Sequence, residues 1–246
     1  MPEVSVIIPV YNSSQYIKKA IDSVLVQNIT YEIIVVDDNS SDNLHQEIAT
    51  YESLPNFIYI KNPQNMGVAI SRNIGVKNAK GRFIAFLDAD DWWQPDKLTK
   101  QISLIKERDC ALCYTARKLY TEEERSINKI IFIKDKVDYN ELLLHNTISC
   151  SSVLMKREIA IQYPMEHSKY HEDYITWLRI LKGGNIAYGI NEPLLNYRLS
   201  KNGKSRNKIK SARMTFGVYR ILGMNMLRAL GFTCSHLAHS IIKYTI

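Results

Sequence analysis

Short apolar runs alternate with segments of helical periodicity between residues 4 and 87. The runs are typical of buried strands and cover residues 4–10, 32–36, 57–60 and 83–87. A helix capped by Ser13 or Ser14 is expected after the first run, and another is expected over about 68–78. Strand, helix and strand repeated in this way predict βαβ units and a mostly parallel sheet flanked by helices.

The pattern is less regular from residue 93 to residue 200. Helices are expected from Pro95 to about 108, near 139–145 and over 174–181, and shorter strands at 111–115 and 152–155. Trp177 lies among apolar neighbours in the last of these helices and is expected in the core. No repeat or Gly/Ser/Pro-rich linker interrupts residues 1–200, which therefore predict one α/β domain.

Composition excludes a disordered chain, because 46% of the 246 residues are hydrophobic and 23% are charged. The net charge of +7 is concentrated at one end. Residues 201–246 hold nine Lys or Arg and no acid, whereas residues 1–200 hold 23 basic and 25 acidic side chains. Because no basic stripe runs through the folded domain, no nucleic-acid partner is expected.

The segment 201–246 reads as a basic, amphipathic helical tail. Its longest uncharged stretch, 229–242, has 14 residues, whereas a bilayer span needs about 20. We expect it to lie on an anionic membrane surface; the alternative is that it packs on its own domain or on a second subunit of a homo-oligomer. The N-terminus lacks a secretory pattern, so the expected location is the cytoplasm, peripheral on the inner face of the cell membrane.

Acidic residues follow two of the predicted strands. Asp37 and Asp38 follow one, and Asp88, Asp90 and Asp91 follow another. Since ligands bind outside the carboxyl ends of parallel strands, these acids are expected to converge on one crevice. Clustered carboxylates repel one another and require a cation, for which oxygen ligands favour Mg²⁺ or Mn²⁺. The chain lacks a P-loop and a dinucleotide-binding glycine motif, so a metal-bound diphosphate is the expected ligand.

Five segments in register resemble the motifs of family 2 glycosyltransferases, which are inverting enzymes of the GT-A, Rossmann-like fold. The segments are 4–12 (VSVIIPVYN), 35–42 (VVDDNSSD), 65–75 (NMGVAISRNIG), 86–92 (FLDADDW) and 172–179 (EDYITWLR). The resemblance implies a nucleotide-sugar donor, usually a UDP-sugar, a divalent metal and an acceptor hydroxyl. It also implies a nucleotide-sugar-binding half over 1–95 and an acceptor half over 96–200.

By the same resemblance, residues of the first half bind the donor. Pro9, Tyr11 and Asn12 match the loop that lines the nucleotide pocket. Asp38 matches the residue that accepts a hydrogen bond from the base, and Arg72 matches a basic residue near the nucleotide or diphosphate.

The metal and the catalytic base are implied by the later motifs. Asp90 would ligate the metal, and Asp88 would hold the ribose or, through water, the metal. Asp173 matches the base that deprotonates the acceptor, while Arg198 is expected near the diphosphate. Ser200 stands where family members often carry a histidine, so no third metal ligand is assigned.

The resemblance favours an inverting, metal-dependent enzyme that adds a sugar to a lipid-linked glycan or an oligosaccharide in cell-surface polysaccharide synthesis. Two other functions stay open at this point: a nucleotidyltransferase on a related fold, and a catalytically silent, membrane-associated nucleotide-binding module. Glu172 and Asp173 could also simply cap the helix that begins near Tyr174.

Overall fold

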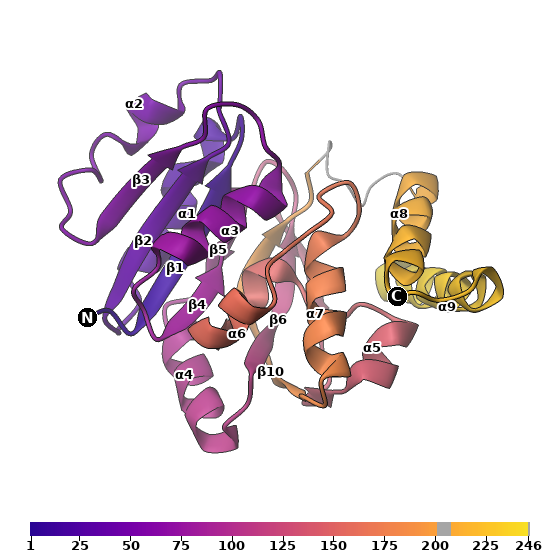
Figure 1. Ribbon diagram of the computed structural model, residues 1–246. Coiled ribbons are helices and arrows are strands. Elements are labelled where there is room, and N and C mark those ends of the chain that lie inside the picture. The colour runs from indigo at the N-terminus through magenta and orange to yellow at the C-terminus, as the bar shows by residue number, and fades with distance from the viewer. Residues whose placement is uncertain (201–207, 246) are drawn as a thin grey trace.

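The computed structural model describes residues 1–200 and 208–245. Its centre is a mixed sheet in the order β3-β2-β1-β4-β9-β6-β10-β5 (Figure 1). The first four strands, all parallel, are β1 (Val4–Val10), β2 (Tyr31–Asp37), β3 (Phe57–Lys61) and β4 (Phe83–Phe86). Every residue of β1 is buried, because both of its neighbours are strands and helices cover both faces.

The sheet becomes mixed beyond β4, so parallel pairing dominates only its first half. There β9 (Leu154–Lys156) runs antiparallel to both β4 and β6 (Leu112–Tyr120), while β10 (Ala187–Arg198) runs parallel to β6. The short strands β5 (Trp92–Trp93), β7 (Ser126–Ile131) and β8 (Lys136–Val137) add antiparallel edges. The α/β class expected from the sequence, a central sheet flanked by helices, is confirmed.

Helices divide the core into two layers on opposite faces of the sheet. One layer lies under α1 (Ser14–Leu25), α2 (Leu44–Ile48) and α4 (Lys97–Arg108). The other is covered by α3 (Val68–Asn78), α5 (Tyr139–Leu144), α6 (Arg157–Gln162) and α7 (Glu172–Lys182), and the 3₁₀ turn η1 (Cys150–Ser152) contributes to it. Trp177 is fully buried in this second layer, as predicted.

Glycines fix the position of α3, the helix that carries Arg72. A Cβ on Gly75 would lie 2.4 Å from Ile7 Cγ2, so only glycine lets α3 approach β1 this closely. Gly67, just before the helix, has φ +89°, which favours glycine.

The expected serine cap of α1 is wrong. Ser13 occupies the N-cap position but makes no side-chain cap bond. Instead Asp42 Oδ2 accepts from the Ser14 N–H at 2.9 Å, so a carboxylate from the loop after β2 satisfies the helix start.

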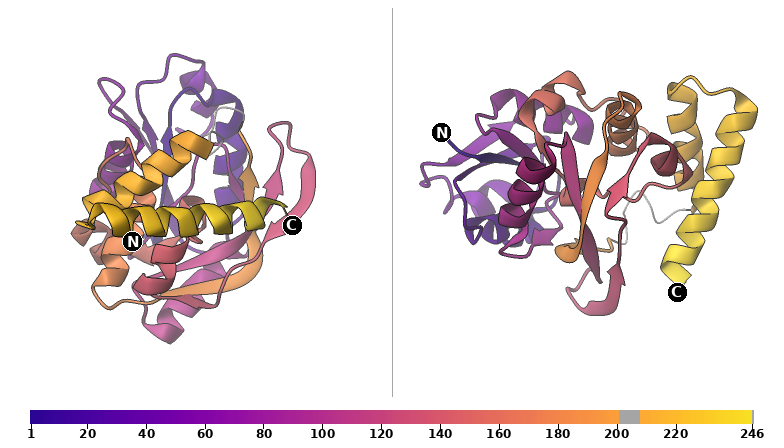
Figure 2. Two further views of the ribbon diagram at one scale, coloured as in Figure 1. Left: turned by 90° about the vertical axis from the view of Figure 1, so that its right-hand side faces the viewer. Right: turned by 90° about the horizontal axis from the view of Figure 1, so that it is seen from below.

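The C-terminal helices are α8 (Lys208–Ile221) and α9 (Met226–Thr245). They lie at one side of the molecule and run in roughly opposite directions, with α9 outermost (Figure 2). Their inner sides pack on the domain: the hydroxyls of Tyr219 and Tyr174 lie 3.0 Å apart, and α9 contacts α5. Within the described residues, no helix is both long and apolar enough to cross a membrane. Residues 201–207 and 246 of the predicted tail lie outside the described part.

Candidate active site

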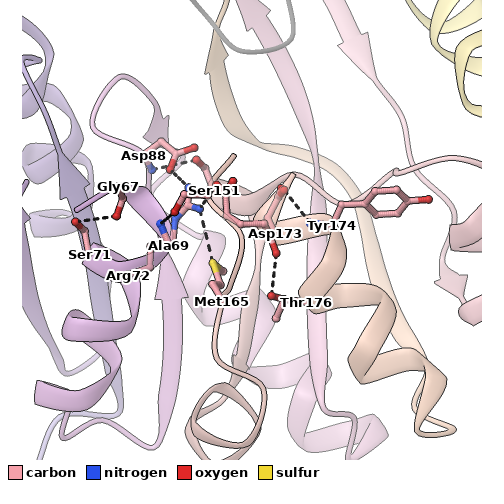
Figure 3. Close-up of polar contacts among 12 residues, drawn as sticks. Gly67, Ala69, Ser71, Arg72, Asp88, Ser151, Met165, Asp173, Tyr174 and Thr176 are labelled. Atoms are coloured by element: carbon pink, nitrogen blue, oxygen red, sulfur yellow. Dashed lines mark hydrogen bonds and ion pairs between the residues drawn. The ribbon is translucent and has the colours of Figure 1, made fainter. Parts of the chain in front are cut away.

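Arg72 joins three elements that are distant in sequence. Its Nη2 donates to Asp88 Oδ1 at 2.6 Å, after β4, and its Nη1 donates to Glu172 Oε1 at 2.9 Å, at the start of α7 (Figure 3). The Arg72 side chain is only 4% exposed, and Glu172 is also buried. Because a buried guanidinium needs charged partners, this pairing fixes α3, the Asp88 loop and α7 relative to one another.

Asp173 lies beside this bridge, in the first turn of α7. Its Oδ1 accepts from the Tyr174 N–H at 2.8 Å, which orients the carboxylate (Figure 3). Burial and the neighbouring charge of Glu172 raise the pKa of Asp173, while His171 and Arg72 oppose the rise. A carboxylate with a raised pKa is a stronger base, as proton abstraction requires.

Asp88 and Asp90 form the acidic part of the site. Burial, and then the charge of Asp88, raise the pKa of Asp90 to about 6. The Asp88 carboxylate is one-third exposed and reaches the surface beside Arg72. Two repelling carboxylates with oxygen donors fit a hard divalent cation. Among the described residues, no three His, Cys, Asp or Glu side chains are grouped to hold a metal ion, so ligands from a substrate would have to complete the shell.

Asp38 is buried and holds the loop before α3. Its Oδ1 accepts from the Met66 N–H and from Asn62 Nδ2, both at 2.8 Å, and its Oδ2 accepts from the Gly67 N–H at 2.7 Å. Asp38 therefore joins the carboxyl end of β2 to the loop between β3 and α3 through contacts within the chain.

The loop after β1 is tied to the loop after β2 through Asn12. Ser41 N donates to Asn12 Oδ1 at 2.8 Å, and Asn12 N donates to Ser40 Oγ at 3.0 Å. Pro9 is buried within β1, whereas Tyr11 is 49% exposed. The three residues that the resemblance assigns to the nucleotide pocket thus lie at the same end of the sheet as Asp38.

Comparison with known proteins supplies the family. The model described as "Glycosyl transferase family 2" matches residues 5–163, well over half of the chain. The chain belongs to glycosyltransferase family 2.

Named relatives of this glycosyltransferase come from bacteria. It is 39% identical over 221 residues to TuaG of Bacillus subtilis (strain 168), whose name assigns it to teichuronic acid biosynthesis, covering 89% of this chain and 88% of that protein. It is also 33% identical over 246 residues to WfgD of Escherichia coli, and the match covers 98% of this chain and 94% of that protein. WfgD is named UDP-Glc:alpha-D-GlcNAc-diphosphoundecaprenol beta-1,3-glucosyltransferase.

Solved structures share its fold. The Staphylococcus aureus TarS fragment 1–349 in complex with UDP-GlcNAc superposes with a TM-score of 0.74 at 19% identity, covering 97% of this chain and 72% of that one. Mannosyltransferase PcManGT from Pyrobaculum calidifontis, in complex with GDP-Man and Mn²⁺, superposes with a TM-score of 0.71 at 17% identity. This match covers 95% of this chain and 68% of that one. At these identities the likeness shows the fold alone.

Arg198 of the glycosyltransferase is enclosed by the chain. Its Nε donates to the Asp90 carbonyl at 2.8 Å, its Nη1 to the Glu122 carbonyl at 2.7 Å and its Nη2 to Glu124 Oε1 at 2.9 Å. The guanidinium also lies 4.4 Å from the centre of the Tyr16 ring. Arg198 therefore braces the loop that contains Asp90 against the β6–β7 turn, and its side chain is only 1% exposed.

Two more of the five acids expected to converge are, like Asp38, buried and bonded within the domain. Asp37 is buried and accepts from Ser40 N at 2.7 Å and from the Tyr59 hydroxyl at 2.8 Å. Asp91 is buried and accepts from Arg198 N at 3.0 Å.

Sequence reasoning missed three supporting residues. The sequence suggests Glu172 only as part of a motif or as a helix cap, whereas the structure pairs it with Arg72. Its position next to Asp173 is the one sequence signal for a role in the site. Ser151, whose Oγ accepts from Asp88 N at 3.1 Å, carries no recognisable sequence signal. Asn73 exchanges two hydrogen bonds with the Met165 backbone, at 2.7 and 2.9 Å, and fastens the segment before α7 to α3.

Proposed function

We propose that this glycosyltransferase moves a sugar from a UDP-sugar to a hydroxyl of a lipid-linked glycan, with inversion, by direct displacement. The observation that carries the proposal is the Arg72 bridge. It joins Asp88 of the acidic pair to Glu172, the residue next to Asp173. A base on the acceptor side and acids on the leaving-group side are the two parts that one displacement needs.

Asp173 is the proposed base. The Tyr174 N–H holds Oδ1, and Oδ2 takes the proton of the acceptor hydroxyl as its oxygen attacks the anomeric carbon. The raised pKa of Asp173 strengthens it for this step. No covalent nucleophile is required, since inversion is completed in one displacement.

Asp88 and Asp90 would hold Mn²⁺ or Mg²⁺ together with the donor diphosphate. When bound, such an ion neutralises the negative charge that develops on the departing diphosphate. Burial and then the charge of Asp88 raise the pKa of Asp90 to about 6, and a bound cation would favour its charged form. Arg72 holds Asp88 in place, and Arg198 holds the backbone of Asp90.

The nucleotide is proposed to bind in the half of the chain over 1–95, against Pro9, Tyr11, Asn12 and the loop shaped by Asp38. The UDP-GlcNAc complex of the similarly folded TarS supports a uridine nucleotide. The acceptor is proposed to bind over 96–200. WfgD, named for a diphosphoundecaprenol-linked acceptor, supports a lipid-linked substrate, and the proposed place of work is the inner face of the membrane.

Turnover tests the proposal. The purified chain with Mn²⁺ should release UDP from one of a panel of UDP-sugars when an undecaprenyl-diphosphate-linked sugar is supplied. The Asp90→Asn variant should lose this release, and excess EDTA should abolish it. No release from any nucleotide-sugar, together with no Mn²⁺-dependent binding of UDP, would overturn the proposal.

A further inference from the structure

The outward face of α9 is apolar. Leu227 is 82% exposed and Leu230 is 48% exposed, and the exposed Cys234 and Ala238 follow at the next two turns. The spacing of three, four and four residues places them on one stripe. The opposite side of the helix faces the domain, where Ala229 is fully buried. A surface helix normally turns polar residues outward, so this stripe requires a cover.

Cations accompany the stripe. Arg228 is exposed on the flank of α9, and Lys210, Arg213 and Arg220 are exposed along α8. The segment 201–246 contains no Asp or Glu. Both helices lie on one side of the molecule, with α9 outermost (Figure 2). An apolar stripe on a segment whose charged side chains are all basic matches the boundary between acyl chains and anionic headgroups.

We propose that the outer face of α9, flanked by the exposed cations of α8, is the surface by which this chain lies on an anionic phospholipid membrane. The inference rests on the proposed function in one respect, because a lipid-linked acceptor gives the attachment its purpose. A second copy of the chain is a poorer occupant. A two-fold interface would place this face against itself and bring together two segments that each carry nine positive charges and no negative ones.

The docking face is coupled to the proposed base. Tyr219 of α8 lies 3.0 Å, hydroxyl to hydroxyl, from Tyr174, the residue after Asp173. Both hydroxyls also donate to carbonyls at the end of α5, to Leu142 and Leu143, at 2.7 Å. These bonds hold the first turn of α7 at a fixed place relative to α8 and α9, so a membrane-bound chain presents its base at a fixed height above the lipid.

Vesicle flotation of the full chain tests the surface. We expect the chain to float with vesicles of phosphatidylcholine and phosphatidylglycerol, and to remain unbound with phosphatidylcholine alone. The double variant Leu227→Glu/Leu230→Glu should reduce binding to the anionic vesicles by about tenfold or more. The matched control is Val26→Glu/Ile161→Glu, which changes two residues that are 56% and 55% exposed, the first directly after α1 and the second on α6. It should bind as the unaltered chain does.

The folding and the UDP binding of each variant are measured separately from its binding to vesicles. Both double variants should keep the thermal midpoint and the UDP affinity of the unaltered chain, so that loss of flotation is not loss of structure. Flotation does not depend on turnover, and a failure of the proposed chemistry therefore leaves this test readable. Equal binding to both vesicle types, binding that survives in Leu227→Glu/Leu230→Glu, or a dimer in solution that this variant dissociates would each overturn the inference.

Discussion

Arg72 and Glu172 form a buried ion pair, with 2.9 Å between Nη1 and Oε1, although they are separated by 100 residues of chain. The same guanidinium binds Asp88 at 2.6 Å. One side chain thus links the helix after β3, the acidic loop after β4 and the helix that carries Asp173. This link determines how the loop of Asp88 and the helix of Asp173 face each other.

Arg72→Met should destabilise the domain severely. It leaves the buried carboxylate of Glu172 without its counter-charge, a loss that costs about 3–5 kcal/mol in the free energy of unfolding. Urea denaturation followed by fluorescence measures the loss. Lys77→Met, on an exposed position of the same helix, should cost less than about 1 kcal/mol. Equal effects of the two substitutions would show that the ion pair does not hold these elements together.

Glu172→Gln should move the acid limb of the pH profile. The charge of Glu172 raises the pKa of Asp173, and the base acts only when deprotonated, so activity rises with pH through that pKa. Neutralising Glu172 lowers the pKa and shifts the acid limb of kcat/KM to lower pH, while the amide oxygen of the glutamine can still accept from Arg72. Glu158→Gln, an exposed acid on α6, should leave the limb unchanged. A shift to higher pH in Glu172→Gln would contradict the assignment.

Local patterns were sufficient for the elements that build the site. The helix expected over about 68–78 is observed over Val68–Asn78, because Gly67 begins it and its apolar spacing is regular. Long-range pairings were not predictable. The sequence predicts that Arg72 binds the donor or lies on the surface. The structure instead pairs it with Asp88 and Glu172, which only the tertiary fold brings together.

The sequence also could not predict in which direction the side chain of each acid points. Asp37 and Asp38 are adjacent and chemically identical, yet one binds Tyr59 and the other binds the loop before α3. Arg198 was expected at the diphosphate, and its enclosure depends on the Glu122 carbonyl and the Glu124 carboxylate of the β6–β7 turn, more than 70 residues away. The metal, the donor contacts and the role of Asp173 remain predictions.

Lys97 should make stability depend on pH. It is fully buried on α4, donates to Gln101 Oε1 at 2.6 Å and lies 4.0 Å from the centre of the Trp93 ring. Burial lowers the pKa of Lys97 to about 7, whereas an unfolded lysine titrates near 10.4. Between these values the unfolded chain binds one more proton, so the free energy of unfolding rises with pH by about 1.4 kcal/mol per unit.

Lys97→Met removes this contribution. Its unfolding free energy, measured in urea between pH 8 and 9.5, should therefore rise less steeply than that of the unaltered chain, by about 1.4 kcal/mol per pH unit. Lys106→Met, on the exposed face of the same helix, should keep the steeper dependence. Parallel curves for Lys97→Met and the unaltered chain would mean that Lys97 is charged in the folded state.

The central claim is that Asp173 takes the acceptor proton while separate acids hold the donor. Asp173→Asn keeps the size of the side chain and its bond from the Tyr174 N–H but cannot act as a base. The deciding measurement is transfer rate against UDP affinity in this one variant, both with Mn²⁺. We predict that transfer falls by about 10²–10⁴-fold while calorimetry gives an unchanged Kd for UDP. Transfer at the unaltered rate, or parallel loss of transfer and UDP binding, would contradict the account.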